Sequence, residues 1–131
     1  MKFHHIGYVV SNISESEEKM IFEKKIKEVF DNIQWAKLSL YANYSDSYIE
    51  LIEPLDDKSY TWNALQKRGP HIHHLCYQVS SIEEIQEFAM KAGMIKIMEP
   101  VPAMLFDDKL VTFYYSKDKQ IVEFLVDSEN K

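Results

Sequence analysis

The sequence predicts an α+β fold of two βαβββ modules, related by an internal pseudo-two-fold axis and forming a metal-binding cleft. The first observation is a phrase that occurs twice, as FHHIGYVVSNIS at residues 3–14 and as IHHLCYQVSSIE at residues 72–83. The second is a helix signal after each copy. The third is that strand patterns follow each helix signal and end in a Glu within an apolar run. Together they indicate a duplicated unit.

Each copy of the phrase is predicted to begin with a strand whose two faces differ. His4 recurs as His73 and His5 as His74, in each case 69 positions later. Because side chains alternate along a strand, neighbouring histidines point to opposite faces. The face with the larger apolar set should pack on the helix, which places His5 and His74 on the open face. His4 and His73 then have the opposite, structural parity, and His71 shares it.

A helix is predicted after each strand, over about residues 14–30 and 81–93. Ser14 to Glu17 and Ser81 to Glu84 both have the S-x-x-E form of a capping box. Apolar residues then recur at helical spacing, and Gly93 suits the end of the second helix.

Strands complete each module, and turn residues separate them. One domain, residues 1–131, is expected, with module 1 at about 1–53, a linker at 54–70 that includes one or two helical turns, and module 2 at about 71–127. Alternating patterns rich in β-branched and aromatic residues predict the remaining strands, with turns at 43–46 and 116–119. These strands are expected at 33–41, 47–53, 94–98, 109–115 and 120–126.

The last strand of each module carries a carboxylate between apolar residues. Glu50 in IELI recurs as Glu123 in VEFL, 73 positions later. Burying an unpaired carboxylate costs several kcal/mol, so both residues should have partners. On the open faces these partners are His5 and His74, and two imidazoles with two carboxylates suit a divalent ion such as Ni, Co, Zn, Mn or Fe. Cys76 shares the open face and is expected to be a small buried filler.

The composition of the chain limits the kinds of partner and the compartment that we expect for the protein. A formal net charge of −6 argues against broad binding to nucleic acid or to a membrane surface. No apolar run approaches the ~18 residues of a membrane span. One cysteine permits no intrachain disulfide, which favours a reducing, cytoplasmic compartment.

With these features the chain resembles the vicinal oxygen chelate superfamily, also called the glyoxalase/bleomycin-resistance/dioxygenase fold. The resemblance covers Phe3 to about Leu125, and His5, Glu50, His74 and Glu123 stand where that family places its metal ligands. Three segments, IELIEPL at 49–55, LQKRG at 65–69 and HHLC at 73–76, are similar to methylmalonyl-CoA epimerases.

The resemblance implies a metal-dependent lyase or isomerase that abstracts a proton α to the carbonyl of a thioester-type substrate. Glu123 would be the catalytic base, with Glu50 as a second catalytic carboxylate. The small-molecule substrate would be a CoA or glutathione thioester, and the protein would be a homodimer.

Two departures keep other functions open. The epimerases carry a further catalytic Glu where this chain has Ile33. Glyoxalase I, acting on a glutathione hemithioacetal, is the alternative enzyme, but its substrate carboxylates are met by arginines and Arg68 is the only arginine here. The alternative of another class is a non-enzymatic small-molecule binding or resistance protein of the same fold. An extradiol dioxygenase is disfavoured because a fourth ligand, Glu50, would occupy a position that oxygen and catechol need.

Overall fold

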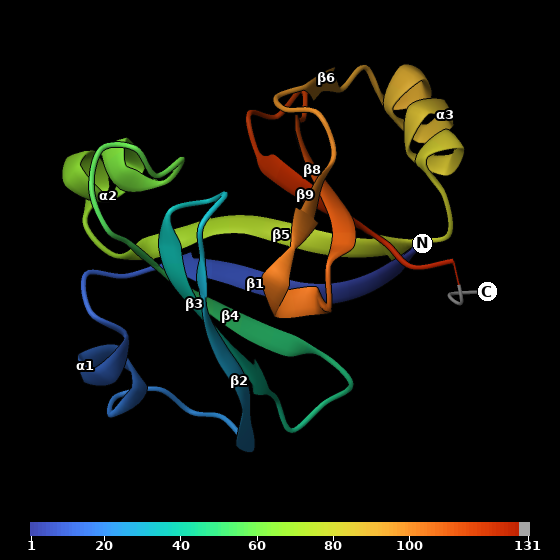
Figure 1. The fold of residues 1–131 in the computed structure, drawn as a ribbon. Helices are drawn as coiled ribbons and strands as arrows, with labels where there is room; N and C mark the ends of the chain where they lie inside the picture. The colour runs from blue at the N-terminus through green and yellow to red at the C-terminus, as the bar shows by residue number, and fades with distance from the viewer. Residues whose placement is uncertain (129–131) are drawn as a thin grey trace. The chain divides into compact units, whose positions relative to one another are not determined.

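The computed structural model describes residues 1–128 and divides into two compact units (Figure 1). The N-terminal unit comprises His5–His73, and the C-terminal unit comprises Met1–His4 with the residues from His74 onward. Within residues 1–128, no helix combines the length and the apolar character that crossing a membrane requires.

The N-terminal unit is a mixed sheet with the short helix α1 on one face and a second short helix, α2, after its last strand. Its strands have the order β2-β3-β4-β1; β1 and β4 are parallel, and the other neighbours are antiparallel. The elements are β1 (Lys2–Val9), α1 (Ile13–Glu17), β2 (Lys24–Asp31), β3 (Ala36–Ala42), β4 (Tyr48–Pro54) and α2 (Trp62–Arg68).

The C-terminal unit repeats this plan. Its strand order is β5-β9-β8-β6, with β7 also paired to β8, and the first and last strands, β5 and β9, are again parallel. The elements are β5 (His71–Val79), α3 (Ile82–Ala92), β6 (Ile95–Lys96), β7 (Val101–Ala103), the 3₁₀ turn η1 (Met104–Phe106), β8 (Lys109–Tyr115) and β9 (Ile121–Val126). The predicted α+β class with βαβββ modules is confirmed.

One predicted element is wrong. Residues 14–30 do not form one helix, because α1 ends at Glu17 and residues 24–31 form strand β2. The apolar positions that suggested a helical stripe do not share a buried face, since Ile26 is 44% and Phe30 is 42% exposed. Residues 24–31 pair with β3 instead, with one register shift between Lys25 and Lys27 that leaves Ile26 as an extra residue in a β-bulge. This tertiary pairing overrides the local pattern.

The two helix starts also differ from each other. At α1 the N-cap is Asn12, whose Oδ1 accepts the Glu15 N–H at 2.9 Å, so the capping box predicted at Ser14 is not formed. At α3 the prediction holds: Ser81 Oγ accepts the Glu84 N–H at 3.1 Å. Gly93 ends α3 in the left-handed region with φ +69°, which suits glycine.

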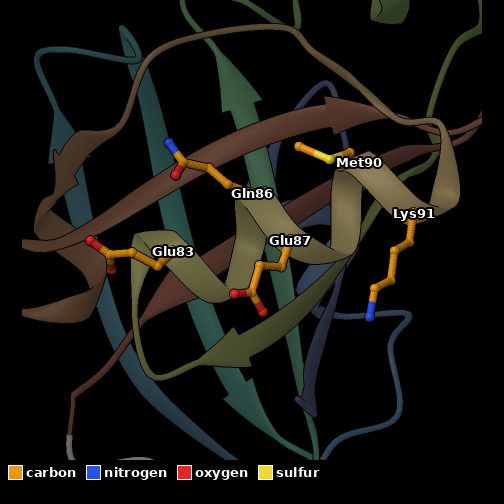
Figure 2. A pocket seen from close by; sticks show the side chains of 5 residues that line it. All are labelled: Glu83, Gln86, Glu87, Met90 and Lys91. Carbon is orange, nitrogen blue, oxygen red and sulfur yellow. The ribbon is translucent and has the colours of Figure 1, made fainter.

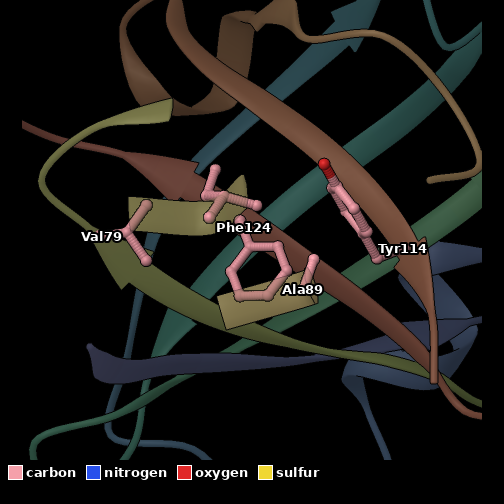
Figure 3. Packing of buried hydrophobic residues seen from close by; sticks show 5 residues of the cluster. Val79, Ala89, Tyr114 and Phe124 are labelled. Carbon is pink, nitrogen blue, oxygen red and sulfur yellow. The ribbon is translucent and has the colours of Figure 1, made fainter. Parts of the chain in front are cut away.

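The helix of each unit packs on an apolar face of the strands. In the C-terminal unit Val79, Ala89, Tyr114 and Phe124 form a core under α3, with the Tyr114 and Phe124 rings edge to face at 5.6 Å (Figure 3). In the N-terminal unit the matching core beneath α1 contains Val10, Ile13, Tyr41 and Leu51. Below, the "open face" of a unit means the sheet face opposite its helix, α1 or α3.

A hydrogen-bonded chain fixes the end of α1 to the sheet. Ser39 Oγ donates to Tyr41 Oη at 2.8 Å, and Tyr41 Oη donates to Glu17 Oε1 at 2.8 Å. Lys25 Nζ reaches the same Glu17 oxygen at 2.8 Å, and hydrogen bonds from Lys25 and then Tyr41 lower the pKa of Glu17. Burial raises the pKa of Tyr41 to about 12.

The buried Tyr41 predicts a loss of stability at alkaline pH. Its folded pKa lies above the unfolded value, so its contribution is intact below pH ~10 and falls as pH rises from about 10 to about 12, by up to ~2 kcal/mol. Urea unfolding at pH 9 and pH 11.5 measures this fall. Tyr41→Phe should shrink the difference between the two pH values, whereas Tyr44→Phe, at a position that is 75% exposed, should leave it unchanged. Equal falls in both variants would contradict the assignment.

Candidate metal centre

A buried imidazole and a buried carboxylate lie side by side on the open face of the N-terminal unit. His5 in β1 is 0% exposed and Glu50 in β4 is 3% exposed. His5 Nε2 lies 3.3 Å from Glu50 Oε1. The parallel pairing of β1 with β4 sets this contact, since Glu50 lies opposite Gly7, two residues beyond His5 on the same face.

The C-terminal unit contains the same pair. His74 in β5 is 3% exposed, Glu123 in β9 is 2% exposed, and His74 Nε2 lies 3.1 Å from Glu123 Oε1. The Phe113 ring meets the His74 imidazole edge to face at 5.3 Å and restricts its rotation. Glu123 lies opposite Cys76, which is again two residues beyond the histidine.

The two His–Glu pairs therefore have the same strand register, which explains why the sequence repeats a His and a Glu at matching points. In each unit the histidine is on the first strand, the glutamate is on the last, and the glutamate faces the residue two places after the histidine. The neighbours of each glutamate, Leu51 and Phe124, belong to the helix-packed cores. Alternation then turns Glu50 and Glu123 to the open faces, as the sequence predicted.

The separation within each pair fits two chemical arrangements. One is a hydrogen bond between imidazole and carboxylate, with one proton between them. The other is a pair of ligands on one cation, since two ligand atoms ~2.1 Å from an ion and 90–110° apart lie roughly 3.0–3.4 Å from each other. In both units the atom facing the carboxylate is Nε2, a usual ligand nitrogen.

His4, His71 and Cys76 have structural surroundings in the fold. The His4 ring packs edge to face on Phe106 at 5.3 Å. The Nδ1 of His71 is hydrogen-bonded to Gly69 O at 2.6 Å at the start of β5. Cys76 is fully buried beside Glu123, as the sequence indicated for a small filler.

One buried carboxylate, Asp31, was not predicted from the sequence. Asp31, at the end of β2, is fully buried, and its Oδ1 accepts the N–H groups of Ile33 and Gln34 at 2.9 and 3.0 Å. These bonds shape the β2–β3 turn, in which Trp35 adopts φ 55°. The segment D-N-I-Q is an Asx-turn pattern and could have marked the end of a strand here.

Two surface pockets in the C-terminal unit do not include Glu123 in their lining. One, of about 360 Å³, lies along the outer side of α3 and is lined by Glu83, Gln86, Glu87, Met90 and Lys91 (Figure 2). The other, of about 680 Å³, includes core residues from beneath α3, among them Tyr77, Val122 and Phe124. Neither pocket has a histidine in its lining, so neither resembles the His–Glu arrangement.

The chain is similar to proteins of known family. Its residues 4–113 match the Glyoxalase/Bleomycin resistance protein/Dioxygenase superfamily. It is 28% identical to the mitochondrial methylmalonyl-CoA epimerase of Dictyostelium discoideum, over 99% of this chain and 78% of that protein.

Two solved structures have the same fold. A hypothetical protein from Bacillus halodurans C-125 is 30% identical, with a TM-score of 0.81 over 99% of this chain and 96% of that one. Methylmalonyl-CoA epimerase from Mycobacterium tuberculosis is 24% identical, with a TM-score of 0.79 over 95% of this chain and 87% of that one. The segment 4–113 that matches the superfamily runs from within β1 to within β8 and contains His5, Glu50 and His74, three of the four paired residues. The chain belongs to the glyoxalase/bleomycin resistance protein/dioxygenase superfamily.

Proposed function

We propose that this protein is a metal-dependent isomerase that moves the proton α to the carbonyl of a CoA thioester, as a methylmalonyl-CoA epimerase does. The observation that carries the proposal is the pair of matched, buried His–Glu contacts, one in each βαβββ unit. The similarity to an epimerase over 99% of the chain supports the substrate class.

The metal site of this proposal is formed by His5, Glu50, His74 and Glu123 together. Two imidazole nitrogens and two carboxylate oxygens fit a divalent first-row ion and leave positions for substrate, and Ni, Co, Zn, Mn and Fe all accept this donor set. When bound, the ion polarises the substrate carbonyl and stabilises the negative charge that develops as the α-proton leaves.

The protein groups supply the proton transfer. Glu123 is the base in this proposal: one carboxylate oxygen takes the proton from one face of the α carbon. Glu50, the second buried carboxylate, would deliver a proton to the opposite face, because Ile33, at the position of the further glutamate of the epimerases, has no acidic group.

Metal analysis tests the site. His5→Ala and His74→Ala should each lower the affinity for a divalent ion by at least ~100-fold, because each removes a ligand. The repeat provides matched controls, since His4→Ala and His73→Ala remove the neighbouring histidine of opposite parity and should keep the metal. Elemental analysis of the purified proteins measures the ion content. Equal loss from the controls, or a wild-type protein that takes up no divalent ion, would favour a non-enzymatic binding protein.

Proton exchange tests the base. Glu123→Gln should retain part of the metal. With α-deuterated methylmalonyl-CoA, the rate at which the α-deuterium is replaced by hydrogen from the solvent should fall by about 10²- to 10⁴-fold. Glu83→Gln, on the outer side of α3, is the control and should exchange like wild type. Mass spectrometry follows the exchange, and a methylglyoxal–glutathione hemithioacetal is assayed in parallel. Full exchange by Glu123→Gln would show the base assignment to be wrong, and turnover of the hemithioacetal alone would favour glyoxalase I.

A homodimer belongs to the same proposal. Large apolar side chains on the surface of the C-terminal unit are compatible with a protein interface, since Met90 is 83% and Ile95 is 70% exposed. Static light scattering at micromolar concentration should give twice the 15.5 kDa mass of the chain. A mass of one chain would contradict the dimer.

A further inference from the structure

The larger pocket of the C-terminal unit, about 680 Å³ in volume, lies beneath the C-terminal end of α3. We call it the α3 pocket. Its lining comes from α3, from β5 and β9, and from the turn between β8 and β9. The strand residues that line it face the helix, so the pocket is on the opposite side of the sheet from Glu123. Its volume is within the roughly 300–1,000 Å³ of small-molecule sites.

Small side chains on α3 create this hollow. Ile85, Ala89 and Ala92 follow one another at helical spacing on the side of α3 that faces the sheet. Ile85 fills its place in the core and is 1% exposed, whereas Ala89 and Ala92 end at Cβ. The space next to Ala92 therefore stays unfilled. A gap of this size is unusual beside a packed core, because interiors leave few voids larger than a water molecule.

The lining of the α3 pocket is mostly apolar. Tyr77 and Val122 line it from the sheet, and both pack against the core under α3. Phe88 lines it from the helix and is 44% exposed, and Met94 lines it just beyond the end of the helix. An apolar ligand that covers this surface removes it from water, which is favourable.

The turn between β8 and β9 adds a cation to this lining. Lys117 lines the pocket, and its side chain lies against Gly93, at the C-terminal end of α3. A Cβ at position 93 would clash with the Lys117 side chain. Gly93 therefore does more than end the helix in the left-handed region, because it also makes room for the lysine beside the pocket.

The charge of Lys117 is available to a ligand. Two other lysines of this unit are near acids: Lys96 Nζ lies 2.7 Å from Glu99 Oε1, and Lys109 Nζ lies 3.7 Å from Asp127 Oδ2. Within residues 1–128 the structure shows no ion pair of Lys117. The acid of the pocket lining is the exposed Asp118, whose short stem keeps its carboxylate at the turn, whereas the lysine stem reaches the end of α3.

We propose that the α3 pocket binds a small amphipathic anion, an aliphatic carboxylate whose chain covers the apolar lining and whose head group pairs with Lys117. An apolar chain matches the lining, and a carboxylate matches the ammonium in charge. This is a second binding site, and it goes beyond the proposed function, which uses the open faces of the sheets.

A series of ligands of increasing chain length tests the proposal. Hexanoate, octanoate and decanoate are titrated into the full chain and followed by calorimetry. The Kd should fall by about fourfold for each added CH₂, because each methylene is removed from water in the pocket. In NMR titrations of the wild-type protein, the amide signals of residues 92–94 and 116–118 should shift most.

Variants separate the chain from the head group. Ala92→Leu fills the hollow and should weaken decanoate binding by at least tenfold, whereas Gln86→Leu, which adds a leucine on the outer side of α3 (Figure 2), should bind like wild type. Lys117→Met should weaken decanoate binding about tenfold and leave the binding of decanol unchanged. Asp118→Asn should tighten decanoate binding by about twofold, because it removes a like charge.

The outcomes also distinguish a ligand site from a structural gap. If the pocket is only a packing gap, decanoate shows no saturable binding and Ala92→Leu raises the unfolding temperature. If Lys117 only stabilises the end of α3, Lys117→Met lowers the unfolding temperature and keeps the wild-type affinity for decanoate. Either result overturns the proposal. Should Ala92→Leu fail to fold, the NMR shifts of the wild-type protein and the Lys117 variant decide.

The test is independent of the proposed isomerase activity. The titrations use neither a thioester nor a metal ion, so decanoate binding that depends on Lys117 stands even if no methylmalonyl-CoA is turned over. Conversely, a protein that exchanges the α-proton but shows no saturable binding of decanoate keeps the proposed function and loses the α3 pocket as a ligand site.

Discussion

The constraint on which the rest of the structure depends is the burial of an imidazole and a carboxylate beside each other, once in each unit. His5 with Glu50 and His74 with Glu123 are at most 3% exposed. Groups of this kind lose several kcal/mol of hydration on burial, and they are retained only where a partner or an ion offsets the loss. Hydration free energy is lost at matched positions in both units, so each unit must place a partner or an ion beside its buried polar groups.

Strand pairing is what makes the offset possible. The parallel contact of the first strand with the last places each glutamate across from a residue two beyond the histidine. A shift of one residue would turn the glutamate into the apolar core under the helix and bring Leu51 or Phe124 to the open face. The apolar cores under the helices therefore also fix the strand register, because burying Leu51 and Phe124 there keeps Glu50 and Glu123 on the open faces.

These relations show why parts of the structure could be predicted from the sequence. The repeat and the two-residue alternation fix the faces of His5 and Glu50 without any knowledge of the remaining chain. Residues 24–31 lacked such a constraint, because Ile26, Val29 and Phe30 fit either a helix or a strand, and pairing with the distant β3 decided between them. The cap at Asn12 was missed for a similar reason, since Asn12 and Ser14 are both good caps and only the position of α1 selects one.

The bulge at Ile26 was also beyond local reasoning, and its consequence is the difference between the two units. Duplication provides two similar open faces, each with one histidine and one glutamate. An extra residue interrupts one edge strand, while the matching strand of the other unit is broken into β6 and β7. One inserted residue thus makes the faces unequal without disturbing either His–Glu pair, because the bulge lies two strands away from Glu50 and the register of β3 with β4 continues unshifted past it.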